Sequence, residues 1–146
     1  MKLFDKDTET LMDILKTSSP SEVKDYMNDI FSDGEATFPN YFDFLLKKKH
    51  LKRQDVLIKA NLPQKYGYKI LTGEAHTSDR DKIIRICLSM EMSLKETQRA
   101  LKLYGMSELY PKIKRDVLLI FAIGKKIYNI DQVNELLLTE NEVPLY

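Results

Sequence analysis

The sequence has little of what marks a secreted, membrane-bound or repetitive protein. Its single cysteine excludes an internal disulfide framework. No apolar run approaches the roughly 18 residues of a membrane span, and the first ten residues lack the apolar core of a signal peptide. Five glycines, five prolines and the lack of any low-complexity tract argue against long linkers. We therefore expect a cytoplasmic protein that does not enter a membrane.

Residues that could carry catalysis are also scarce. His50 and His76 are far apart in the chain, and there is no HExxH, no CxxC and no phosphate-binding glycine loop. Cys87 falls on an apolar helical face, where a small core residue is the simplest interpretation. Asp79 and Asp81 are interpreted as charges at a helix start rather than a catalytic pair. We expect a protein without enzymatic activity, without a bound metal and without a cofactor.

What is present indicates a helical globular protein. The chain has 146 residues, 43% of them hydrophobic and 31% charged, which suits one domain with a small appendage. No strand alternation is visible, whereas helical spacing and capping signals recur from end to end. The sequence predicts an all-α protein of about nine helices. Expected caps or helix starts are Ser19, Pro20, Ser78, Ser93 with Glu96, Pro111 and Asn129.

The most informative stretch runs from Lys52 to Gly73. Its first half, Arg53–Ala60, has helical spacing, and a second helical pattern over Gln64–Thr72 stops at glycine. Only Asn61 to Pro63 lie between the two. A helix, a tight turn and a second short helix have the layout of a helix-turn-helix, which places its second helix in the DNA major groove.

The charge distribution agrees with this interpretation. Residues 1–40 contain four lysines and nine acidic residues, whereas residues 41–82 contain ten basic and five acidic residues. The net charge of +1 therefore hides an acidic start and a basic block over the candidate motif. A basic patch favours nucleic acid, although a solvated lysine face would give the same composition.

Residues 41–105 resemble the Cro/phage-repressor family of helix-turn-helix proteins, also called the XRE family. Gly73 matches the glycine that closes the recognition helix, and SLKETQRALKLYG is similar to the fifth helix. The tail LYPKIKRDVLLIFAIGKKIYNIDQVNELL resembles an extension seen in a branch of these regulators in low-GC Gram-positive bacteria. The resemblance implies a lambda-repressor-like five-helix domain. The matching helices are Phe42–Lys49, Arg53–Ala60, Gln64–Thr72, Asp79–Met90 and Leu94–Tyr104.

The chain departs from the family at three positions of the motif. Asn61 stands where the turn usually has glycine, Leu71 where glutamate is common, and Pro63 where a polar cap is common. Asparagine tolerates the left-handed backbone, so the first change is mild. Residues 1–40 have no counterpart in the resemblance.

The resemblance, together with the polar residues expected on the outer face of the Gln64–Thr72 helix, predicts a DNA interface. Gln64 can pair with adenine and Lys65 or Lys69 with guanine, while Gln54 matches the residue that touches a phosphate in the family. Tyr66, Ile70 and Leu71 are expected to anchor the inner face, with a base contact as the alternative for Tyr66. The expected base contacts are Gln64, Lys65, Tyr66, Tyr68 and Lys69. The expected phosphate contacts are Lys49, Lys52, Arg53, Gln54, Thr77, Ser78 and Arg80.

The sequence thus predicts a nucleoid-associated transcriptional regulator that binds double-stranded DNA. We divide it into an acidic helical hairpin (1–38), a DNA-binding domain (39–105) and a helical extension (106–146). The extension either builds a homodimer or covers the fourth and fifth helices within one chain. A different class stays open: an adaptor or antitoxin-like module that uses residues 1–38 or 106–146 to bind a protein partner.

Overall fold

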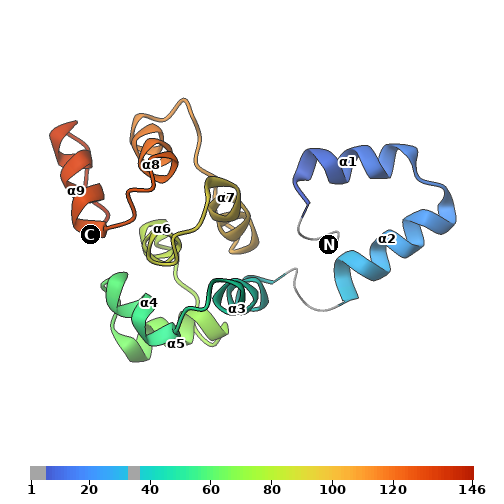
Figure 1. Cartoon of the computed structure of the whole chain (residues 1–146), viewed down its shortest axis with the longest axis horizontal. Helices are drawn as coiled ribbons and strands as arrows, with labels where there is room; N and C mark the ends of the chain where they lie inside the picture. Colours follow the sequence, from blue (N-terminus) through green and yellow to red (C-terminus); the bar gives the residue numbers. More distant parts are fainter. Residues whose placement is uncertain (1–5, 33–36) are drawn as a thin grey trace.

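The structure is a computed structural model that describes residues 6–32 and 37–146, with the side chains of residues 28–32 left out. All regular structure in this part of the chain is helical, with nine helices and no strand, which confirms the all-α class (Figure 1). The helices are α1 (Thr8–Thr17), α2 (Pro20–Ser32), α3 (Phe38–Lys49), α4 (Arg53–Lys59), α5 (Gln64–Thr72), α6 (Arg80–Ser89), α7 (Leu94–Leu103), α8 (Lys114–Gly124) and α9 (Ile130–Thr139).

Several helix ends lie where the sequence predicts them. Helix α5 has the predicted bounds and closes at Gly73, whose φ of 85° is left-handed. Ser93 and Glu96 form the predicted capping box of α7, each accepting a hydrogen bond from the other's backbone N–H. The Asn129 side chain caps α9 by accepting from the backbone N–H of Gln132 at 3.0 Å.

Two predicted helix starts are wrong. The cap of α6 is Asp79 rather than Ser78, because the Asp79 carboxylate accepts from the backbone N–H of Asp81 at 3.0 Å. Helix α8 begins at Lys114 rather than at Pro111. The intervening residues form a turn in which the backbone N–H of Ile113 donates to the carbonyl of Tyr110 at 3.1 Å.

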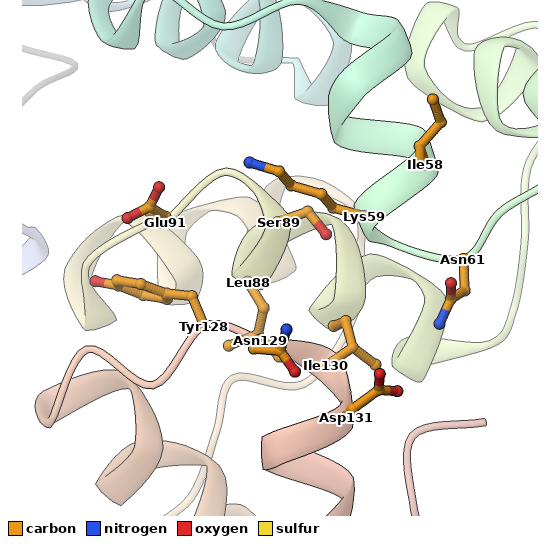
Figure 2. Close-up of a pocket in the computed structure, with 10 residues that line it drawn as sticks. All are labelled: Ile58, Lys59, Asn61, Leu88, Ser89, Glu91, Tyr128, Asn129, Ile130 and Asp131. Carbon is orange, nitrogen blue, oxygen red and sulfur yellow. The ribbon is translucent and has the colours of Figure 1, made fainter.

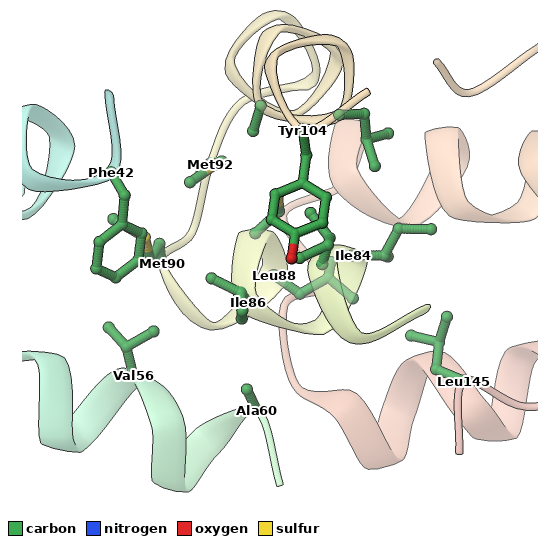
Figure 3. Packing of buried hydrophobic residues seen from close by; sticks show 14 of the residues in the cluster. Phe42, Val56, Ala60, Ile84, Ile86, Leu88, Met90, Met92, Tyr104 and Leu145 are labelled. Atoms are coloured by element: carbon green, nitrogen blue, oxygen red, sulfur yellow. The ribbon is translucent and has the colours of Figure 1, made fainter. Parts of the chain in front are cut away.

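Helix α6 runs through the centre of the hydrophobic core. Every residue from Ile83 to Met90 is buried, and α4, α7 and α9 pack around it (Figure 3). Cys87 belongs to this core as predicted, and burial raises the pKa of its thiol to about 12.

The same core continues beyond Gly105 into α8 and α9. Leu119, Val133 and Leu137 are fully buried, and α8 packs on α7 while α9 packs on α6. These two helices therefore cover the preceding helices within one chain, which is one of the two roles that the sequence leaves open for residues 106–146.

Helices α1 and α2 contrast with the rest of the molecule. They project from one side of the α3–α9 body (Figure 1), and α1 contains no buried residue. The described anchors of α1 are polar: Asp7 caps the helix and forms an ion pair with Lys95 at 3.2 Å. Within the part of the chain that the structure describes, no helix combines the length and apolar character needed to cross a membrane.

Candidate nucleic-acid interface

Helices α4 and α5 form a tightly packed pair joined by four residues, Ala60 to Pro63. Asn61 adopts the left-handed backbone with φ of 56°, as its place in the turn requires, and its carbonyl accepts from Arg85 at 3.3 Å. Leu62 points into the core. Gly67, in the middle of α5, is buried, and a β-carbon there would lie 2.5 Å from Leu57 Cδ2. Only glycine allows this close approach without a shift of Leu57.

The two faces of α5 differ as the sequence predicts. Ile70 and Leu71 are buried to within 1%, whereas Gln64, Lys65 and Tyr68 are exposed, Tyr68 by 49%. The remaining expected base contacts lie in between: Tyr66 and Lys69 are half-buried. Because the inner face is fixed in the core, the outer face is held outward as a rigid polar surface.

Tyr68 is held in place from α4 and α3. Arg53 at the start of α4 donates to the Tyr68 hydroxyl at 3.1 Å and lies 5.3 Å from the centre of the ring. The same guanidinium forms an ion pair with Asp43 of α3, and this carboxylate raises the pKa of Arg53. This Asp43–Arg53–Tyr68 network orients a side chain that would otherwise turn freely in solvent.

Four of the other expected contacts lie exposed near α4 and α5. Lys52, immediately before α4, and Lys65 of α5 form no ion pair with any described residue. The side-chain amide of Gln64 reaches the carbonyl of Gln54 at 3.4 Å, so the starts of the two helices adjoin. The starts of α4 and α5 and the outer face of α5 therefore form one surface, on which Lys52 and Lys65 are not paired with any carboxylate of the described residues.

The other expected phosphate contacts are arranged differently. Ser78 is exposed in the loop before α6, but Thr77 is buried, and its hydroxyl accepts from the backbone N–H of Asp79. Lys49 forms an ion pair with Glu96 at 3.0 Å. Arg80 donates to both carboxylate oxygens of Asp116 and to two backbone carbonyls. Thr77, Lys49 and Arg80 therefore have partners within the chain, and we leave these three side chains out of the proposed interface.

The close approach of Gly67 to Leu57 and the network around Arg53 are not predicted by the sequence analysis. Glycine between two tyrosines in a helix is a signal of close packing, but the partner helix cannot be identified from it. The Arg53 partners lie 10 and 15 positions away in the chain, beyond the spacing at which helical neighbours can be paired by inspection.

A pocket of about 320 Å³ opens beside the end of α4, between α6 and the start of α9 (Figure 2). Lys59, Glu91 and Asp131 line it, so charges of both signs meet there, and the pocket favours no single class of charged ligand. Among the described residues, no group of three or more histidine, cysteine or acidic side chains is placed to hold a metal ion.

Comparisons of the chain with protein-family models, with curated proteins and with solved structures returned no match. The resemblance to the XRE family therefore rests on the matching residues of the sequence alone.

Proposed function

We propose that the protein is a sequence-specific, DNA-binding transcriptional regulator that inserts α5 into the major groove. In this proposal α3 to α7 correspond to the five helices of a lambda-repressor-like domain, with α4 and α5 as the helix-turn-helix. One observation carries the proposal: α5 is fixed by its buried inner face while Gln64, Lys65 and Tyr68 stand exposed on its outer face.

Each exposed group has a role in this arrangement. Gln64 and Lys65 at the first turn of α5 are of the types that read adenine and guanine edges. Lys52 and Gln54 at the start of α4 would contact a phosphate on one side of the groove, and Ser78 would contact one on the other. Arg53 is half-buried and paired with Asp43, so it would reach a phosphate only where the duplex displaces that carboxylate. Tyr66 and Lys69 are half-buried, so their contribution depends on how deeply α5 enters the groove.

The test begins with selection of bound fragments from genomic DNA. Fluorescence anisotropy then measures the affinity of a selected duplex over a range of salt concentrations. The Lys65→Ala variant should lose about 1–3 kcal/mol and relax base preference, because it removes a base contact. The Lys52→Ala variant should weaken all duplexes about equally and flatten the salt dependence.

Lys24→Ala, an exposed lysine of α2, is the matched control and should bind like the parent. The proposal is wrong if the parent selects no sequence, or if Lys65→Ala and Lys52→Ala both bind the selected duplex with the parent's affinity and salt dependence.

A protein-interaction module is the second candidate function, and one observation favours it. Large apolar side chains of α1, α2 and α8 are exposed, among them Met12, Met27 and Phe121. An adaptor or antitoxin-like protein would use such surfaces to hold a partner. Weak duplex binding with little salt dependence would favour this candidate.

A further inference from the structure

The outer side of α8 carries a row of exposed apolar side chains. Ile113, immediately before the helix, and Val117 and Phe121 within it follow each other at four-residue spacing and therefore share one face. They are exposed by 51%, 42% and 48% respectively, while the opposite face of α8 is buried in the core. We call these three residues the α8 stripe.

Positive charge surrounds the α8 stripe. Lys112 and Lys114 lie at its start, and Lys125 and Lys126 lie at its end. None of these four exposed lysines forms an ion pair with a described residue. The two other charged residues between Lys112 and Lys126 form ion pairs within the chain: Arg115 pairs with Asp81, and Asp116 pairs with Arg80.

The complementary surface lies on the same chain, in α1 and α2. Here Met12, Leu15 and Met27 are exposed by 52%, 37% and 47%. The exposed acidic side chains around them are Glu9, Asp13, Glu22 and Asp25, against two exposed lysines, Lys16 and Lys24. Asp13 lies 4.0 Å from Lys16, and both side chains are about 70% exposed. Each of the two helices is amphipathic, and none of their described apolar side chains is fully buried: Leu11, Ile14, Val23 and Tyr26 are half-buried.

We infer that the protein forms a homodimer in which the acidic α1–α2 hairpin of each copy docks on the α8 stripe of the other. Apolar side chains then meet apolar side chains, while the acidic rim of the hairpin meets the basic rim of α8. A two-fold arrangement contains this contact twice, so no hairpin and no stripe is left uncovered.

The alternatives fit the charges less well. An antiparallel pairing of α8 with α8 would bring Lys112 of one copy toward Lys125 of the other, which like-charge repulsion opposes. Docking within one chain is opposed by the arrangement, since α1 and α2 project away from α8 (Figure 1). The inference concerns assembly and is independent of whether the protein binds DNA.

The test is sedimentation of the full-length protein without DNA. The parent should dimerise. Val117→Asp should weaken the dimer by at least about tenfold, because it places a charge in the centre of an apolar contact. Ile58→Asp is the matched control: Ile58 is exposed by 57% on α4, outside the stripe, and this variant should dimerise like the parent.

A charge exchange separates the proposed contact from any other. Asp13→Lys with Asp25→Lys on the hairpin, and Lys112→Glu with Lys125→Glu beside the stripe, should each weaken the homodimer by at least about tenfold. An equimolar mixture of the two double variants should form a heterodimer, because the reversed charges are again complementary.

A parent that stays monomeric, or a mixture that forms no heterodimer, would overturn the inference. So would a hairpin variant that dimerises like the parent, since the contact would then not involve the hairpin. Duplex binding by Lys112→Glu with Lys125→Glu, measured separately, shows whether the DNA proposal holds when the dimer is lost, so the two proposals can fail independently.

Discussion

Gly67 of α5 faces Leu57 of α4 so closely that a β-carbon at position 67 would lie 2.5 Å from Leu57 Cδ2. Alanine is the better helix former by about 1 kcal/mol, yet Gly67→Ala should destabilise the fold by about 1–3 kcal/mol. The reason is that the Leu57 side chain, which is 1% exposed, must shift against its packed neighbours to make room for the methyl group. Urea denaturation followed by circular dichroism measures the change.

Gly124→Ala is the control for this substitution. Nothing lies within 4 Å of a β-carbon built at Gly124, so the fold should keep its stability or gain up to about 1 kcal/mol. Equal effects of the two substitutions would contradict a close contact between α4 and α5.

Arg80 is expected to matter for stability rather than for DNA. Its guanidinium holds the buried carboxylate of Asp116, at 2.9 and 3.0 Å, and ties α8 to the start of α6. Arg80→Leu should destabilise the protein by about 3–5 kcal/mol, because it leaves a buried charge unpaired.

Lys52→Ala should give the opposite result when urea denaturation and duplex binding are measured for both variants. Because Lys52 is exposed, its removal should change stability by no more than about 0.5 kcal/mol while weakening duplex binding. If Arg80→Leu folds with the parent's stability and only binds DNA less well, Arg80 belongs to the interface after all.

The alkaline stability of the protein should depend on Cys87. Burial raises the pKa of this thiol from 9.0 to about 12, so the folded state keeps the proton that the unfolded state loses. This contribution to stability is present below pH 9 and is lost as the pH rises toward 12. Cys87→Ala should therefore show a smaller decline in the free energy of unfolding over that range.

The same burial predicts slow reaction with thiol reagents at pH 8, at a rate set by unfolding. Rapid labelling of the folded protein would contradict the burial of Cys87 in the core.

Local signals in the sequence were enough to predict the helices but not how they pair. Gly73, Ser93 and Asn129 mark helix ends through their own backbone or side chain, and these three ends are confirmed. The helix start predicted at Pro111 is wrong, because proline suits a turn as well as a helix start. Which charge meets which depends on packing: Arg115 pairs with Asp81, 34 positions away in the chain.

The predicted site was limited by the same difficulty. The outward positions of α5 follow from helical periodicity, and the structure exposes Gln64, Lys65 and Tyr68. Periodicity cannot predict the ion pairs of Lys49 and Arg80, because their acidic partners come from α7 and α8.

Asp43 is the one acidic partner of Arg53 in the described part of the chain, and it leads to a prediction of tighter binding. Asp43→Asn removes a negative charge beside the proposed phosphate contact and leaves the Arg53 guanidinium without a counter-charge. Because the pair is partly exposed, its loss should cost the fold no more than about 1 kcal/mol. Affinity for non-specific duplex at low salt should rise.

The salt dependence shows whether Arg53 is responsible. A freed Arg53 that neutralises one more phosphate should steepen the slope of log affinity against log salt by about 0.9. Glu135→Gln, at an exposed position of α9, makes the same charge change away from α4, α5 and the α8 stripe, and should leave the slope unchanged. An equal rise in affinity for both variants would mean that net charge alone attracts the duplex. A slope that does not change in Asp43→Asn would place Arg53 outside the DNA interface.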